Sequence, residues 1–146
     1  QGTGNISYDP ANHQHMVDMR AQKVANVAND LPPLEVVGDK SGDVLVLGWG
    51  SPRGAITAAV TRMQQRGHKI SAAFLRHLNP LPNDLEALMR SFKRVVLPEL
   101  NKGQLALMLR STYLIDVQSY SQVNGQPFRS QDIEDFMEKV LEEWQG

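Results

Sequence analysis

Polar and aromatic residues that could do chemistry gather in three short segments. These segments are Gly48-Trp49-Gly50-Ser51, His77-Leu78-Asn79-Pro80 and Pro98-Glu99-Leu100-Asn101. Each follows an apolar run, and in a parallel α/β sheet the loops after the strands' carboxyl ends are where ligands and partners bind. The candidate interface or loop residues are therefore Trp49, Ser51, His77, Asn79, Glu99, Asn101 and Gln104.

Glu99 and His77 are the candidates for acid–base chemistry, because a carboxylate beside an imidazole can transfer protons. They would then make the chain an independent enzyme. The preferred interpretation is that they form hydrogen bonds within a turn or an interface. No serine lies in a Gly-x-Ser-x-Gly elbow, and His13 and His15 form an isolated pair without further ligands. We therefore predict no catalytic residue and no metal site in this chain.

The absence of cysteine narrows the chemistry further. Without cysteine the chain has no disulfide, no thiolate nucleophile, no thiolate ligand for an iron–sulfur cluster and no zinc site of the cysteine type. We therefore expect the chain to do no redox, metal or covalent-nucleophile chemistry by itself.

A glycine-rich turn, residues 48–54, joins the first predicted strand to the first predicted helix. Free N–H groups at a helix start favour an anion. The glycines occupy the first, third and seventh places, whereas a dinucleotide fingerprint has its third glycine at the sixth. Pro52 also removes one N–H donor. We interpret the glycines as a tight turn, and the alternative is a stand-alone α/β module that binds a nucleotide or another anion at the Gly48–Ser51 loop.

Alternating apolar runs and amphipathic stretches must position these loops. Strands are predicted over residues 44–48, 70–75 and 94–97, each followed by a helix, with a weaker edge strand over 114–123. Asn101 is expected to cap the third of these helices, with Gln104 at the capping-box position. A last apolar stripe predicts a helix from Ser130. The fold class is α/β, three-layer, with a mainly parallel sheet of about five strands flanked by helices.

The composition is that of an ordinary globular protein. The 146 residues are 41% hydrophobic and 21% charged, with a net charge of −1. A charge so near zero gives no general attraction to nucleic acid or to an anionic membrane. No apolar run approaches the length of a membrane helix, and no signal segment opens the chain, so we expect a cytoplasmic protein.

The first forty residues differ from the rest. A helix is predicted over residues 13–28, and Pro32 and Pro33 follow its end. Residues 38–42 are typical of a linker. We therefore divide the chain into residues 1–40, a tail and connector, and residues 41–146, the α/β domain. The first residue is glutamine, which suggests a segment cut from a longer polypeptide.

Four motifs occur in the same order as in a known enzyme family. They are Leu47–Ser51, His77–Pro82, Leu97–Leu105 and Val123–Phe128. This set resembles the end of the alpha subunit of 2-oxoacid:ferredoxin oxidoreductases, the 2-oxoglutarate type above all. Gly2–Pro10 and His13–Lys23 resemble the tail of the preceding thiamine-enzyme domain and its connector. Where the family commonly has Ser-Thr-Tyr-Gly, this chain has Ser51-Pro52-Arg53-Gly54.

The resemblance implies a fold similar to the transketolase C-terminal domain. It implies an intact enzyme that decarboxylates a 2-oxoacid on thiamine diphosphate with Mg²⁺, passes electrons through an iron–sulfur cluster to ferredoxin, and forms an acyl-CoA from coenzyme A. Other domains and subunits of the family hold the thiamine and the cluster, so this chain is expected to bind no cofactor. The implied partners are the beta subunit, the rest of the alpha subunit and, through the complex, ferredoxin.

The role implied for this domain is to position the catalytic domains and to build the subunit interface. The loops that contain Glu99 and Asn101 combine prolines with uncharged polar groups, which suits docking against a fixed protein surface. Glu99 and Asn101 are therefore expected to matter for assembly more than for the fold.

Overall fold

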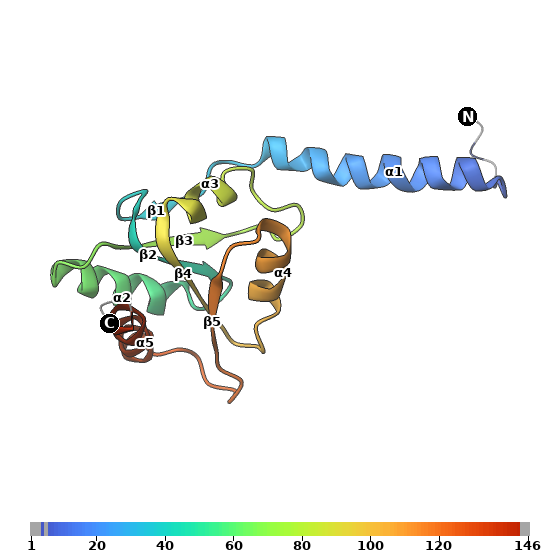
Figure 1. The fold of residues 1–146 in the computed structure, drawn as a ribbon. Helices are drawn as coiled ribbons and strands as arrows, with labels where there is room; N and C mark the ends of the chain where they lie inside the picture. Colours follow the sequence, from blue (N-terminus) through green and yellow to red (C-terminus); the bar gives the residue numbers. More distant parts are fainter. Residues whose placement is uncertain (1–3, 5, 144–146) are drawn as a thin grey trace.

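The chain alternates between strands and helices from residue 42 onward (Figure 1). The computed structural model describes residue 4 and residues 6–143, so Gly2, Thr3 and Asn5 of the upstream motif lie outside the described residues. In chain order the elements are α1 (Pro10–Asn26), η1 (Val27–Asp30), β1 (Val36–Val37), β2 (Gly42–Trp49), α2 (Arg53–Gln65), β3 (Ile70–Leu75), α3 (Leu85–Arg90), β4 (Phe92–Glu99), α4 (Gln104–Tyr113), β5 (Val117–Ser121) and α5 (Ser130–Glu142).

Within the described residues the sheet has five strands, in the order β1-β3-β2-β4-β5. Strands β3, β2, β4 and β5 are parallel, and β1 runs antiparallel to β3. Every residue of β3 is buried, as expected for a strand covered on both faces. The predicted mainly parallel sheet is confirmed, and β5 lies at an edge as its weaker apolar content predicted.

Helices cover both faces of the sheet, so the three-layer prediction is also confirmed (Figure 1). Side chains of a strand point alternately to the two faces. Val46 accordingly packs beneath α2 and α5, while its neighbour Leu47 packs beneath α3 and α4. Two apolar cores, one on each side, hold the strands at fixed positions and thereby fix the loops at their ends.

A buried carboxylate joins α5 to α2. The side chain of Glu134 on α5 is only 5% exposed. Its carboxylate accepts hydrogen bonds from Arg62 Nε at 2.7 Å and from the Arg66 guanidinium at 2.6 Å. Because each oxygen has its own arginine donor, the buried charge is compensated and the two helices are held in one relative position.

The first helix, α1, projects away from the α/β layers (Figure 1), and it contains no buried residue. None of the described helices combines the length and the apolar composition needed to cross a membrane. Strand β1 pairs with Ala72 and Ala73 of β3. The sheet therefore includes two residues that precede the predicted boundary at residue 41, and the division into 1–40 and 41–146 stays a prediction.

Candidate functional site

The loops after β2 and β4 form a crevice at the carboxyl edge of the sheet. β2 and β4 are neighbours, yet the helices that follow them, α2 and α4, lie on opposite faces. The two loops therefore diverge, and such a point is where α/β proteins commonly bind ligands. The crevice has a volume of about 320 Å³. Of the predicted residues it contains Trp49, Ser51, Glu99 and Asn101.

Glu99 is buried and bonded to its own domain. Its carboxylate accepts hydrogen bonds from the Leu105 amide at 3.2 Å and the Ala106 amide at 2.8 Å. These amides belong to the first turn of α4, where N–H groups have no partner inside the helix and the helix dipole favours a negative charge. Glu99 therefore anchors α4 to the end of β4 and has a role in the fold. That Glu99 matters for assembly more than for the fold stays a prediction.

Asn101 and Gly103 shape the turn that leads into α4. The Asn101 side-chain oxygen accepts hydrogen bonds from the Gly103 amide at 2.7 Å and the Gln104 amide at 3.2 Å. Gly103 has a φ of 83°, a left-handed conformation that glycine adopts without strain. The prediction that Asn101 caps this helix is wrong, because Gly103 is the N-cap, although the Asn101 side chain still accepts a hydrogen bond from the amide of the first helical residue. The prediction for Gln104 is wrong, because Gly103 shifts the start of α4 and makes Gln104 its first residue.

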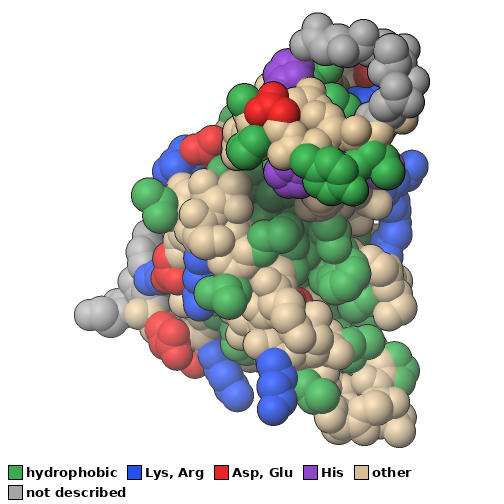
Figure 2. Space-filling view, turned by 90° about the vertical axis from the view of Figure 1, so that its right-hand side faces the viewer, with side chains coloured by type: hydrophobic (Ala, Val, Ile, Leu, Met, Phe, Trp, Pro, Cys, Tyr) green, Lys and Arg blue, Asp and Glu red, His purple; other side chains and the backbone are tan. Residues whose placement is uncertain are grey.

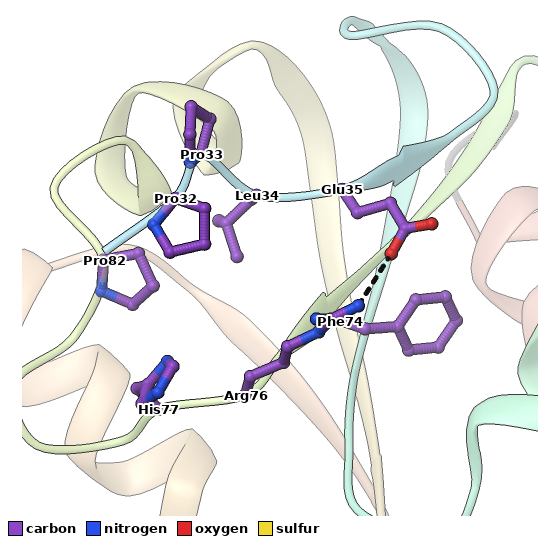
Figure 3. A pocket seen from close by; sticks show the side chains of 8 residues that line it. All are labelled: Pro32, Pro33, Leu34, Glu35, Phe74, Arg76, His77 and Pro82. Atoms are coloured by element: carbon purple, nitrogen blue, oxygen red, sulfur yellow. Dashed lines mark hydrogen bonds and ion pairs between the residues drawn. The ribbon is translucent and has the colours of Figure 1, made fainter. Parts of the chain in front are cut away.

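His77 lies away from Glu99. It follows β3, and β2 separates β3 from β4. His77 lines a second concavity, of about 240 Å³, together with Arg76 and three prolines (Figure 3). The proton-transfer pair considered for Glu99 and His77 is therefore not assembled: the two side chains line different hollows, and the carboxylate is bonded to α4.

Asn79 lines a third hollow, a groove of about 740 Å³ between α1, the loop after β3 and α4. The peptide bond between Asn79 and Pro80 is cis. Figure 2 shows hydrophobic side chains gathered in the hollow below α1. The apolar residues that line it come from all three segments: Ala21, Val24, Ala25, Ala28, Leu78, Pro80, Leu81, Met108 and Tyr113.

A charged cluster beside the second concavity, formed by Glu35, Arg53 and Arg76, was not predicted from the sequence. Oε2 of Glu35 accepts hydrogen bonds from Arg53 at 3.0 Å and from Arg76 at 3.3 Å. The bond from Arg53, with the positive charges of both arginines, lowers the pKa of the Glu35 carboxyl below its ordinary value. The guanidinium of Arg53 also lies over the ring of Phe74, 4.6 Å from its centre. The only signal in the sequence was Arg53 itself, in the loop that departs from the family's pattern.

The described residues do not fit the cofactors that the resemblance implies. Among residues 4 and 6–143, no three His, Asp or Glu side chains gather closely enough to hold a metal ion such as the Mg²⁺ of thiamine diphosphate. The start of α4, which would suit a diphosphate, is bonded to the Glu99 carboxylate instead. The whole sequence has no cysteine to ligate a cluster.

The similar proteins of known identity are subunits of 2-oxoacid oxidoreductases. No protein-family model matches the chain. The 2-oxoglutarate oxidoreductase subunit KorA of Mycobacterium tuberculosis is 45% identical over 142 residues, which cover 96% of this chain and 21% of the relative. The 2-oxoacid:ferredoxin oxidoreductase 2, subunit alpha, of Aeropyrum pernix is 28% identical over 145 residues, 95% of this chain and 23% of the relative. The chain thus spans less than a quarter of these relatives.

Solved structures agree with the sequence relatives. The 2-oxoglutarate:ferredoxin oxidoreductase of Magnetococcus marinus, with 2-oxoglutarate, coenzyme A and succinyl-CoA bound, superimposes with a TM-score of 0.89 and 32% identity, over 95% of this chain and 25% of that one. A split-gene transketolase, with a TM-score of 0.56 and 19% identity over 73% of this chain and 41% of that one, shares the fold. By sequence and by its transketolase C-terminal-like fold, this chain is a relative of one segment of the alpha subunits of 2-oxoacid:ferredoxin oxidoreductases.

Proposed function

We propose that this chain is the C-terminal assembly domain of the alpha subunit of a cytoplasmic 2-oxoglutarate:ferredoxin oxidoreductase. The observation that carries the proposal is the 45% identity to the KorA subunit, which extends over nearly the whole chain. The intact enzyme would decarboxylate 2-oxoglutarate oxidatively with coenzyme A, form an acyl-CoA and reduce ferredoxin. Its thiamine diphosphate, Mg²⁺ and iron–sulfur cluster would be held by other domains or by the beta subunit.

The geometry of the crevice supports a role in assembly rather than in chemistry. The carboxylate of Glu99 is bonded to the amides of α4 and is withdrawn from solvent. The crevice keeps an apolar wall that includes Trp49, Pro98 and Leu100. Rigid apolar loops that are held in place by internal hydrogen bonds suit contact with a fixed protein surface.

The same geometry disfavours the alternative, an anion-binding module at the Gly48–Ser51 loop. Pro52 stands as the N-cap of α2 and has no N–H to donate. The Leu105 and Ala106 amides at the start of α4 already donate to the Glu99 carboxylate, so they are not available to an anion.

The test is to produce the full-length subunit together with its beta partner and to assay ferredoxin reduction that depends on coenzyme A. We expect 2-oxoglutarate to be oxidised in preference to pyruvate and to other 2-oxoacids. Activity with none of the 2-oxoacids, or the absence of any stable partner subunit, would overturn the proposal.

The isolated 146-residue chain provides a second test. With 2-oxoglutarate, coenzyme A, thiamine diphosphate and a redox dye, we expect no dye reduction above that of a heat-killed sample. We also expect no micromolar binding of thiamine diphosphate or of Mg²⁺ in calorimetric titrations. Dye reduction, or micromolar binding of either ligand, would mean that this domain itself takes part in catalysis.

A further inference from the structure

Three elements bring a pair of arginines together at the carboxyl edge of β3. The register pairs Val36 with Ala73, so Glu35 lies beside Phe74 just outside the ladder. Arg76 follows two residues beyond Phe74, and alternation along the chain directs it to the same face. Helix α2 begins on that face with Arg53. Both guanidinium groups consequently reach one carboxylate oxygen, Oε2 of Glu35.

The position of Arg53 is prepared by the core beneath it. A Cβ on Gly48 would come within 2.8 Å of the Phe74 ring and 2.7 Å of Ile56, so only glycine lets this ring lie against β2. The ring in turn supports the Arg53 guanidinium, whose centre is 4.6 Å from the ring centre. An arginine held in this way loses little conformational freedom when it binds a partner.

The cluster of Arg53, Arg76 and Glu35 has a net positive charge, because the single carboxylate of Glu35 compensates only one of the two guanidinium groups. Each arginine makes one hydrogen bond to Glu35, although a guanidinium has five N–H donors. The side chains are open to solvent, with 67% of Arg76 and 44% of Arg53 exposed. The longer of the two bonds, 3.3 Å, belongs to the more exposed Arg76, which makes it the bond that an incoming carboxylate can replace most readily.

The adjoining concavity fits a side chain better than a free ligand. Its volume of about 240 Å³ lies below the range of roughly 300–1,000 Å³ that small-molecule sites occupy. Pro32, Pro33 and Pro82 form a stiff wall, with Arg76 and His77 near it (Figure 3). Partly exposed arginines beside rigid apolar walls are typical of protein interfaces.

We propose that Arg76 and Arg53 bind an aspartate or glutamate side chain of a partner subunit, which takes the position that Glu35 now holds at Arg76. The inference rests on the proposed function, since the relatives are subunits of larger enzymes and a partner subunit is then present. Before assembly Glu35 occupies the two guanidinium groups, so its carboxylate competes with that of the partner.

The test measures the dissociation constant between the full-length subunit and its beta partner at low and at physiological salt. Arg76→Glu should raise the dissociation constant roughly tenfold or more, whereas Glu35→Gln, which removes the competing charge, should lower it several-fold. Arg90→Glu is the matched control, because Arg90 is also an exposed, ion-paired arginine. It lies just before β4 begins, at the amino ends of the parallel strands, whereas Arg76 lies at their carboxyl ends. The Arg90→Glu variant should therefore leave the dissociation constant unchanged. Thermal melts show that each variant is folded.

The outcomes separate the two proposals. If the wild-type subunit binds its partner and Arg76→Glu binds equally well, or if Glu35→Gln weakens binding, the docking site is refuted while the proposed function stands. If no beta partner binds the wild-type subunit, the proposed function fails as well. Saturable, Arg76-dependent binding of inorganic phosphate to the 146-residue chain at submillimolar concentration would make this a small-anion site and would also overturn the inference.

Discussion

The carboxylate of Glu99 lies 2.8 Å from the backbone amide of Ala106, which is seven positions further along the chain. Strand β4 ends at Glu99, and α4 begins five residues later at Gln104. The end of a strand thus supplies the negative group that the start of the next helix requires, inside the protein where water cannot replace it.

We expect Glu99→Ala to lower the free energy of unfolding of this chain by about 2–4 kcal/mol, because two amides of α4 lose their acceptor in a buried position. Glu99→Gln should cost less, since an amide oxygen can still accept one of the bonds. Asn101→Ala should cost less, about 1 kcal/mol, because the Gly103 and Gln104 amides that lose their acceptor are more open to water. Urea denaturation followed by circular dichroism measures all three, and a Glu99→Ala variant as stable as the wild type would contradict the anchoring role.

The ion cluster between α2 and α5 should respond asymmetrically to mutation. Replacing both Arg62 and Arg66 by alanine leaves the Glu134 carboxylate buried without a partner, which should cost about 3 kcal/mol or more. Glu134→Ala leaves two half-exposed arginines that water can solvate, and should cost about 1–2 kcal/mol. Arg110→Ala is the control, because its contact with Asp116 is exposed and 3.7 Å long. Equal losses for the two cluster variants in urea denaturation would show that the carboxylate is not effectively buried.

Two glycines should respond in opposite directions to replacement by alanine. At Gly48 a Cβ would lie 2.7 Å from Ile56 and 2.8 Å from Phe74, so we expect a loss of about 1–3 kcal/mol through overpacking. At Gly54, inside α2, no atom lies within 4 Å of the added Cβ, and alanine should stabilise the helix by about 0.5–1 kcal/mol. Thermal melts measure the melting temperatures of the two variants, which should fall for Gly48→Ala and rise for Gly54→Ala. A shift of the melting temperature in the same direction for both would contradict this packing.

The chain should lose stability at alkaline pH in part through Tyr120, which stacks on Phe136 at a centroid distance of 4.5 Å. Desolvation by burial, followed by the charges of Asp132 and Asp135, raises the pKa of the Tyr120 phenol above its ordinary value of 10.0. The folded chain therefore keeps this proton after the unfolded chain has released it. The resulting stabilisation is complete below the unfolded pKa and is lost as the pH rises through the folded pKa.

Phenolate absorbance measures this titration directly. The difference between the curves of the wild type and of Tyr120→Phe, which preserves the ring stacking, isolates the Tyr120 phenol. We expect its midpoint above pH 10, and a midpoint at or below 10 would mean that the phenol is not desolvated in the fold.

The alternation of strands and helices, and the loops that they position, could be predicted from the order of the amino acids. Apolar periodicity is a local property, so the buried run Ile70–Leu75 and the amphipathic stretch of α5 were visible without any structure. The same reasoning found the edge position of β5 and the loops that line the crevice. It did not find β1, because two residues are too few to show a period and Val36 and Val37 are strand residues only through their pairing with β3.

The partners of the charged side chains, in contrast, depend on how the chain folds in three dimensions. Glu134 bonds to Arg62 at a separation of 72 residues and Glu35 to Arg76 at 41, and no local pattern links such pairs. The same holds for Glu99, whose carboxylate turns to α4, while His77, on the far side of β2, lines another hollow. Hydrogen bonds and ion pairs require atoms within about 3 Å, and which atoms come that close depends on the order of the strands and on the face that each helix covers.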